Sequence, residues 1–168
     1  MDASTGATQR VVLLRVTAMV AVVTAVIHFA VAGEHYSEYW AFGVFMLGSA
    51  WLQLAWAVGL LVRPSRVLIA AGAALNAGII AVYIVTRTAG DVIGPTPHDV
   101  EPVGFGDAFC TVCEVLLVVA AVLLLLRPWQ RRVSRAWAVG APTATAALGA
   151  VLLSVSLVAG GSEMVMRM

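Results

Sequence analysis

A small set of polar and ionisable residues lies within the long apolar stretches of this sequence, where burying such groups in lipid costs free energy. They are His28, Gln53, Asn76, Tyr83 and Glu114. Groups of this kind at membrane depth pair with one another or form sites for ions, protons or ligands. An imidazole with carboxylates suits a divalent transition metal, and a buried Glu–His pair suits proton transfer. The residue types therefore direct attention to His28 and Glu114.

Helical spacing gathers more side chains around this pair. Asp107, Cys110 and Glu114 follow i, i+3 and i+7 spacing, which places them on one face of a helix. His28 and His35 are also seven positions apart, and share a face if one helix carries both. We therefore predict an outward-facing cavity that binds a divalent metal ion or a small ligand. Its floor is His28 and Glu114, its mouth is His35, Glu38, Glu101 and Asp107, and Arg87 and Tyr83 are supporting residues.

The same polar groups have a purely structural explanation. Side chains of this kind also join helices by hydrogen bonds in lipid. Arg87 is placed to balance the negative charge, and can neutralise Glu114 or Asp107 as an ion pair. The spacing of the histidines and acids matches no recognised metal motif. The sequence thus leaves open a metal or ligand site, a proton-transfer pair and interhelical hydrogen bonding.

Cys110 and Cys113 are the only cysteines in the chain and offer a different chemistry. A Cys-x-x-Cys pair near the start of a helix supports thiol–disulfide exchange. The run from Phe109 to Cys113 resembles the active-site helix of the vitamin K epoxide reductase and DsbB-type thiol oxidases. That resemblance implies a redox pair at Cys110 and Cys113, with a quinone as a candidate partner. Those enzymes also use a second cysteine pair on an outer loop, which this chain lacks, and two cysteines at this spacing are also ordinary packing residues.

These residues belong to a very apolar chain of 168 residues, 61% hydrophobic and 11% charged, with a mean hydropathy of +0.96. A soluble domain is about one quarter charged, so this chain lacks the polar surface to sit in water. Stretches long enough to cross a bilayer, about 20 residues each, lie at 11–32, 40–62, 67–86, 105–126 and 136–159. Each should be helical because no water satisfies its backbone. We predict an all-α bundle of five transmembrane helices.

The arginines fix the orientation of this bundle. They cluster at the start of the first span, between the second and third, and between the fourth and fifth: Arg10, Arg15, Arg63, Arg66, Arg127, Arg131, Arg132 and Arg135. The positive-inside rule places a short tail, 1–10, which we expect to be disordered, in the cytoplasm, and a tail at 160–168 outside. The proline-rich loop at 89–104 also lies outside, and loops of that length are usually functional or disordered. We expect a multi-pass protein of the bacterial cytoplasmic membrane.

The first apolar stretch permits a second interpretation. Ala30-Val31-Ala32 before Gly33 resembles the small-residue cleavage site of a signal peptidase. The stretch is longer than a usual signal core and contains His28, which favours an uncleaved helix. Cleavage after Ala32 would leave four spans.

A run of motifs links the outer loop to the following span: Arg87-Thr88-Ala89-Gly90, Gly94-Pro95, Glu101-Pro102-Val103-Gly104, Asp107 and Glu114. With His28 and the run from Glu34 to Glu38, this pattern resembles a family of small, uncharacterised polytopic membrane proteins of high-GC Gram-positive bacteria. The resemblance covers about half of the chain. It implies that the loop and Glu114 belong to one functional unit, and it brings no known activity.

Small residues at four-residue spacing bear on packing and partners. Ala70, Ala74 and Gly78 in the third span, and Thr145 and Gly149 in the fifth, predict close helix packing in lipid. They leave open a homo-oligomer or a subunit of a larger membrane complex. The sequence carries no phosphate loop and no hydrolase elbow, and no basic stripe that favours nucleic acid.

Overall fold

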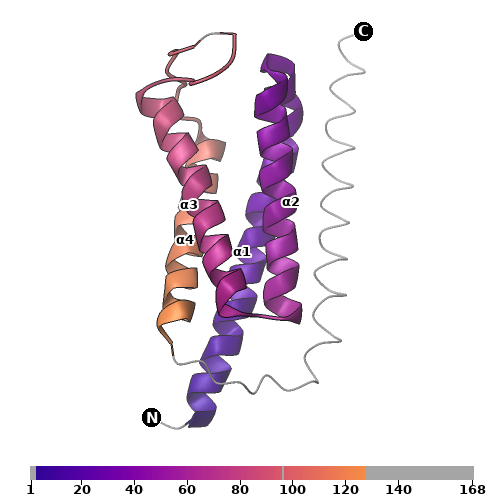
Figure 1. The fold of residues 1–168 in the computed structure, drawn as a ribbon, viewed down its shortest axis with the longest axis vertical. Coiled ribbons are helices and arrows are strands. Elements are labelled where there is room, and N and C mark those ends of the chain that lie inside the picture. The colour runs from indigo at the N-terminus through magenta and orange to yellow at the C-terminus, as the bar shows by residue number, and fades with distance from the viewer. Residues whose placement is uncertain (1–2, 96, 128–168) are drawn as a thin grey trace.

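The computed structural model describes residues 3–95 and 97–127, and this part of the chain is all-helical. Its elements, in chain order, are α1 (Ala3–Glu38), α2 (Trp40–Val62), α3 (Arg66–Thr88) and α4 (Phe105–Leu126). Consecutive helices run antiparallel, and the loop between α3 and α4 lies at the end of the bundle opposite the start of α1 (Figure 1).

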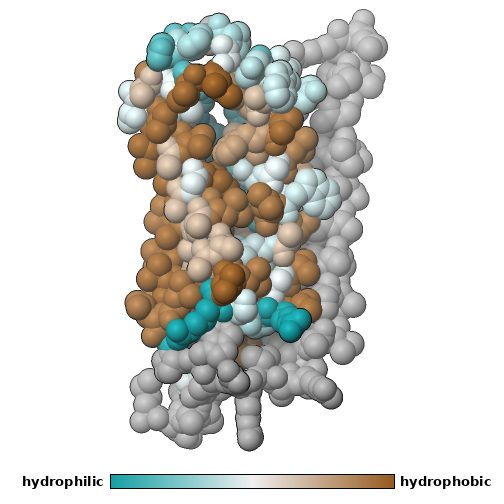
Figure 2. Space-filling view, viewed as in Figure 1, coloured by the Kyte–Doolittle hydropathy of each residue, from teal (hydrophilic) through white to brown (hydrophobic). Residues whose placement is uncertain are grey.

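The four helices are long and apolar enough to cross a membrane. α2 and α3 have 23 residues each, about 35 Å at 1.5 Å per residue, against a hydrocarbon core of about 30 Å. Figure 2 shows a hydrophobic band between hydrophilic side chains at the two ends. The described residues therefore hold four of the predicted spans rather than five, and form a helical bundle of the integral-membrane type. The predicted span at 136–159 and the tail at 160–168 lie outside the described residues.

α1 is longer than the apolar stretch that predicts it. It begins at Ala3, so the expectation of a disordered start is wrong from that residue onward, and it continues through Gly33 to Glu38. The helix contains no proline, and one glycine costs about 1 kcal/mol, too little to end a packed helix. His28 and His35 therefore lie on one continuous helix.

The helices form a closed ring of neighbours. Each helix packs on the next in the chain, and α4 packs back on α1. The α1–α2 contact is the most extensive and the α2–α3 contact the least, so the bundle is tightest around the first hairpin. Small residues make that closeness feasible: Ala18, Ala21 and Ala25 of α1 and Ala57 of α2 are fully buried.

The packing face of α3 differs from the one predicted. Ala70, Ala74 and Gly78 are exposed on the outer surface of the bundle, and a Cβ added to Gly78 would meet nothing within 4 Å. The buried face contains Gly72 instead, on which the Trp56 ring lies so closely that an added Cβ would fall 1.8 Å from its Cε2 atom. The small-residue spacing therefore does not mark the face of α3 that packs against the other described helices, and whether it packs on a partner stays a prediction.

Two polar side chains predicted near mid-membrane join α2 to α3. The Gln53 side-chain amide donates to Oδ1 of Asn76 at 3.0 Å, and the Asn76 amide donates to the Gly72 carbonyl at 2.8 Å. Both side chains are fully buried. For this pair the structural explanation, hydrogen bonding between helices, is confirmed.

The outer loop is held in a defined shape by its own backbone. The Asp91 N–H donates to the Asp99 carbonyl at 3.2 Å, and the His98 N–H donates back to the Asp91 carbonyl at 2.9 Å. Gly90 adopts a φ of 81°, and a Cβ there would meet the His98 carbonyl carbon at 2.4 Å, so the turn requires glycine. The loop thus closes on itself next to the end of α3.

Candidate functional site

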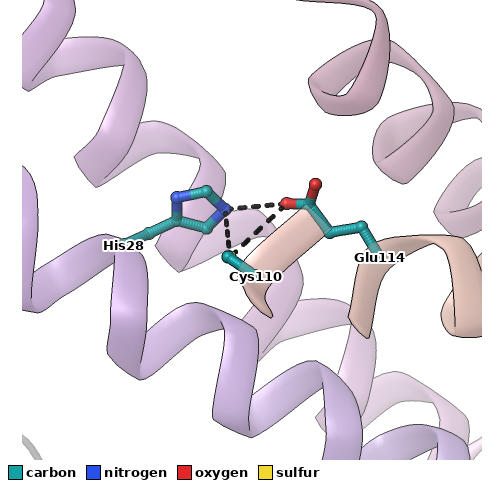
Figure 3. A group of neighbouring side chains, drawn as sticks. All are labelled: His28, Cys110 and Glu114. Carbon is teal, nitrogen blue, oxygen red and sulfur yellow. Dashed lines mark hydrogen bonds and ion pairs between the residues drawn. The ribbon is translucent and has the colours of Figure 1, made fainter. Parts of the chain in front are cut away.

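Two side chains of α4 and one of α1 meet inside the bundle. Cys110 and Glu114 are one helical turn apart on α4, and both point toward His28 of α1 (Figure 3). His28 Nε2 lies 3.0 Å from Oε1 of Glu114, within hydrogen-bond distance. Cys110 Sγ lies 3.9 Å from each of these two atoms. We call these three residues the triad.

The triad is buried and lies below the outer end of the bundle. His28 is 5% exposed, Cys110 6% and Glu114 1%. Glu114 follows the first residue of α4, Phe105, by nine positions, which places it about 14 Å along the helix axis. Burial of a polar group without a partner costs several kcal/mol, so the three side chains satisfy one another at this depth.

A second polar cluster lies nearer the outer surface. Arg87, at the end of α3, forms ion pairs with Glu101 of the loop and with Asp107 of α4, the latter at 2.9 Å. Its guanidinium also lies 5.0 Å from the centre of the Tyr83 ring. The Glu101 N–H donates to the Thr86 carbonyl at 3.3 Å. Arg87 therefore balances charge as predicted, with Asp107 rather than Glu114 as its partner in the next helix.

His35 and Glu38 form a third, separate pair at the end of α1. Their side chains are 3.1 Å apart, and the Glu38 side chain is 49% exposed. Of the predicted metal ligands, the structure thus brings together only His28 and Glu114. Asp107 is occupied by Arg87, and the His35–Glu38 pair is not part of the triad.

A cavity of about 580 Å³ connects these groups. The triad lies at its deep end, while His35, Arg87, Glu101 and Asp107 lie along it, as the sequence predicts. Glu38 is not among its lining residues. Most of the wall is apolar, and its apolar side chains come from α1, α2, α3 and the loop: Ile27, Val31, Phe42, Phe45, Met46, Ile79, Val82, Val92 and Ile93. Figure 2 shows the surface hollowed beneath the arch of the loop, with hydrophilic atoms visible inside.

Two residues of the cavity have roles that sequence reasoning missed. The sequence placed Cys110 on the same helix face as Glu114, but it was not included among the predicted metal ligands. Asp91 was not among the predicted cavity residues, yet it is 7% exposed and lines the cavity. Cys113 is buried but is not among the lining residues, so the two cysteines have different surroundings.

No protein-family model, curated protein or solved structure matches the chain. The fold and the site nevertheless define a class: a helical membrane protein with a buried His–Cys–Glu group at the end of a largely apolar cavity.

Proposed function

We propose that this membrane protein binds a divalent transition-metal ion through His28, Cys110 and Glu114, at the deep end of a cavity open to the extracytoplasmic side. The observation that supports this most is the convergence of one nitrogen, one sulfur and one oxygen donor within 4.8 Å of one another, all on buried side chains. Imidazole and thiolate select zinc and its neighbours over magnesium and calcium.

The distances between the three donor atoms are close to those around a tetrahedrally coordinated zinc ion. Zinc bond lengths of about 2.0–2.3 Å place neighbouring donors about 3.3–3.6 Å apart. The triad has one separation of 3.0 Å and two of 3.9 Å. Movements of about 0.3–0.5 Å, within the reach of small side-chain rotations, would convert one arrangement into the other. Three protein donors leave a fourth position, which the cavity makes accessible to water or to a small ligand.

Charge balance favours a divalent ion over a monovalent one. A bound metal takes the thiolate form of Cys110 and the carboxylate form of Glu114. Together with neutral His28, these ligands contribute two negative charges, which a dication cancels. A neutral complex avoids the large cost of leaving net charge in the low-dielectric interior of a membrane.

The orientation follows from the charges at the two ends of the bundle. Three arginines lie at the end opposite the outer loop: Arg63 directly after α2, Arg66 at the start of α3, and Arg127 directly after α4. The positive-inside rule makes that end cytoplasmic. The cavity then opens to the outside of a bacterial cytoplasmic membrane, and a fifth span at 136–159 would bring the C-terminus to the same side.

The chain supplies a matched pair for the test. Cys110→Ser removes a triad donor, whereas Cys113→Ser changes a buried cysteine three positions away that does not line the cavity. Purified wild-type and Cys113→Ser proteins should hold about one zinc per chain, and Cys110→Ser and Glu114→Ala should hold little. Cobalt substitution should give thiolate-to-metal charge-transfer absorption in the first two proteins only. Equal metal content in both cysteine variants would reject the site.

A second candidate, thiol–disulfide oxidation, is favoured by one observation. The Cys110 sulfur lines the cavity beside an imidazole and a carboxylate, groups that can accept its proton. Oxidation of Cys110 and Cys113 to a disulfide would release two protons and two electrons, and a quinone in the apolar cavity would accept both to become a hydroquinone. This function requires both cysteines, so Cys113→Ser would abolish quinone reduction while leaving metal binding intact.

A further inference from the structure

Asp91 is a buried acid that the metal site does not use. It is 7% exposed and lines the cavity, although it belongs to the outer loop. Its backbone N–H and carbonyl are both bonded within the loop. Within residues 3–95 and 97–127, no hydrogen bond or ion pair of its carboxylate is found. Most of the residue is covered, but its carboxylate oxygens are not among the enclosed, unpartnered side-chain atoms of the described residues, so they remain accessible to a cation.

The charges around the cavity leave Asp91 uncompensated. The positive charge of Arg87 is matched by Glu101 and Asp107, and Glu114 is paired with His28. Among the lining residues that the structure describes, acids therefore exceed fixed cations. This excess repels anions and attracts a cation to the mouth.

The walls next to Asp91 are apolar and aromatic. Val92 and Ile93 follow it in the loop and line the cavity with Phe42 and Phe45 of α2. A Cβ added at Gly94 would lie 3.0 Å from the tip of the Phe42 ring, which shows how closely the loop covers the start of α2. Phenyl rings attract cations through their faces and also accept alkyl groups. The volume of about 580 Å³ matches the range of about 300–1,000 Å³ that holds one small organic ligand.

The cavity also reaches the lipid-facing side of the bundle. Ala81, Val82 and Val85 of α3 line it and are exposed on the outer surface. They lie on the side where α2 and α3 make the least contact. Within residues 3–95 and 97–127, this wall of the cavity therefore faces the surroundings of the bundle.

We infer that the cavity binds an amphipathic organic amine, with its ammonium group on Asp91 and its apolar part among the aromatic and aliphatic side chains of the wall. This site is distinct from the triad and does not depend on the metal proposal. It adds a substrate class, membrane-partitioning organic cations, to the chemistry of this cavity.

Three probes with the same alkyl chain test the inference: octylamine, octanol and octanoate, titrated calorimetrically into the full chain in lipid nanodiscs, with empty nanodiscs subtracted. Octylamine should bind saturably and at least about tenfold more tightly than the other two, because a hydrogen bond to a charged group is worth about a factor of ten to one hundred in affinity. Octanoate binding as tightly as octylamine, or octylamine binding no better than empty discs, would overturn it.

Paired variants assign the binding to Asp91 and to the cavity. Asp91→Asn should weaken octylamine binding by about ten- to a hundredfold, and Asp99→Asn, an exposed acid of the same loop, should leave it unchanged. Ala81→Phe, which places a ring at the lipid-facing wall, should block binding, and Ala77→Phe, one turn earlier and outside the cavity, should not. Equal effects within either pair reject the assignment.

Metal content measured on the same samples separates the two proposals. Asp91→Asn should retain as much zinc as the wild type, since Asp91 is not a triad member. Octylamine binding that persists in Cys110→Ser supports the amine site even where zinc is lost. Loss of octylamine binding in Glu114→Gln, with Asp91→Asn unaffected, would place the ammonium at the floor of the cavity and overturn the inference.

Discussion

Replacing Glu114 with glutamine tests whether this residue acts as a metal ligand or only as a hydrogen-bonding partner of His28. Glutamine keeps the length of the side chain and an oxygen that can still accept a hydrogen bond from Nε2 of His28, now 3.0 Å from the carboxylate. It removes the negative charge, and a neutral amide is a poor ligand for zinc beside a thiolate. Stability without metal should therefore change by less than about 1 kcal/mol, close to the net value of one hydrogen bond.

The effect on metal-linked stability should be larger. At a free zinc concentration of about one hundred times the dissociation constant, the wild type should gain about 2.7 kcal/mol. Loss of a residue that only orients a ligand weakens metal binding about 10–100-fold, so loss of a direct ligand should weaken it by about one hundredfold or more. At the same zinc concentration, the variant would then gain at most about 0.4 kcal/mol.

Unfolding of the purified protein in mixed detergent micelles measures the stability without metal when a chelator is present, and the gain in stability when zinc is present. His35→Gln is the matched control, because His35 also lines the cavity but pairs with Glu38 rather than with the triad. It should retain the full gain with zinc. A Glu114→Gln protein stabilised by zinc as much as the wild type, or a wild type that zinc does not stabilise, would refute the reasoning.

Arg87→Ala should free the outer loop at a cost of about 1–3 kcal/mol, since two acids lose their shared partner; hydrogen exchange should show faster loss of the Glu101 amide proton, and unchanged exchange there would contradict this role. Gly72→Ala should destabilise the bundle by about 1–3 kcal/mol, because the new Cβ would fall 1.8 Å from the Trp56 ring. Gly78→Ala, with nothing within 4 Å, is its control in detergent unfolding, and equal stability of the two variants would disprove the contact.

The approximate positions of the four described helices could be predicted because they depend mainly on the length of each apolar stretch, although α1 extends beyond its stretch at both ends. In lipid no water can bond to the backbone of an apolar stretch, so the stretch forms an α-helix whatever its neighbours are. The meeting of His28 and Glu114 at the floor of one cavity was also predicted, because both are ionisable groups inside apolar stretches and such groups tend to pair. Asp107, Cys110 and Glu114 do line one cavity, as their spacing on α4 predicts.

The faces of the helices and the shape of the loop could not be predicted in the same way. In lipid the outer face of a helix is as apolar as its inner face, so Ala70 and Gly78 look as suited to packing as Gly72 does. The burial of Asp91 depends on backbone angles at Gly90 and His98, both with positive φ. Sequence patterns of the loop carry no information on where that turn directs the acid.

The separation of His28 and Glu114 along the chain has a consequence for biosynthesis. The two residues are 86 positions apart, so at about 5–20 residues per second His28 is synthesised roughly 4–17 seconds before Glu114. During that interval the first hairpin, already closely packed, carries an unpaired imidazole toward lipid. Insertion of α4 is what satisfies it. If synthesis stopped before α4, the α1–α2 hairpin would keep an unpaired imidazole at His28. Membrane quality-control proteases can recognise an unpaired polar group of this kind.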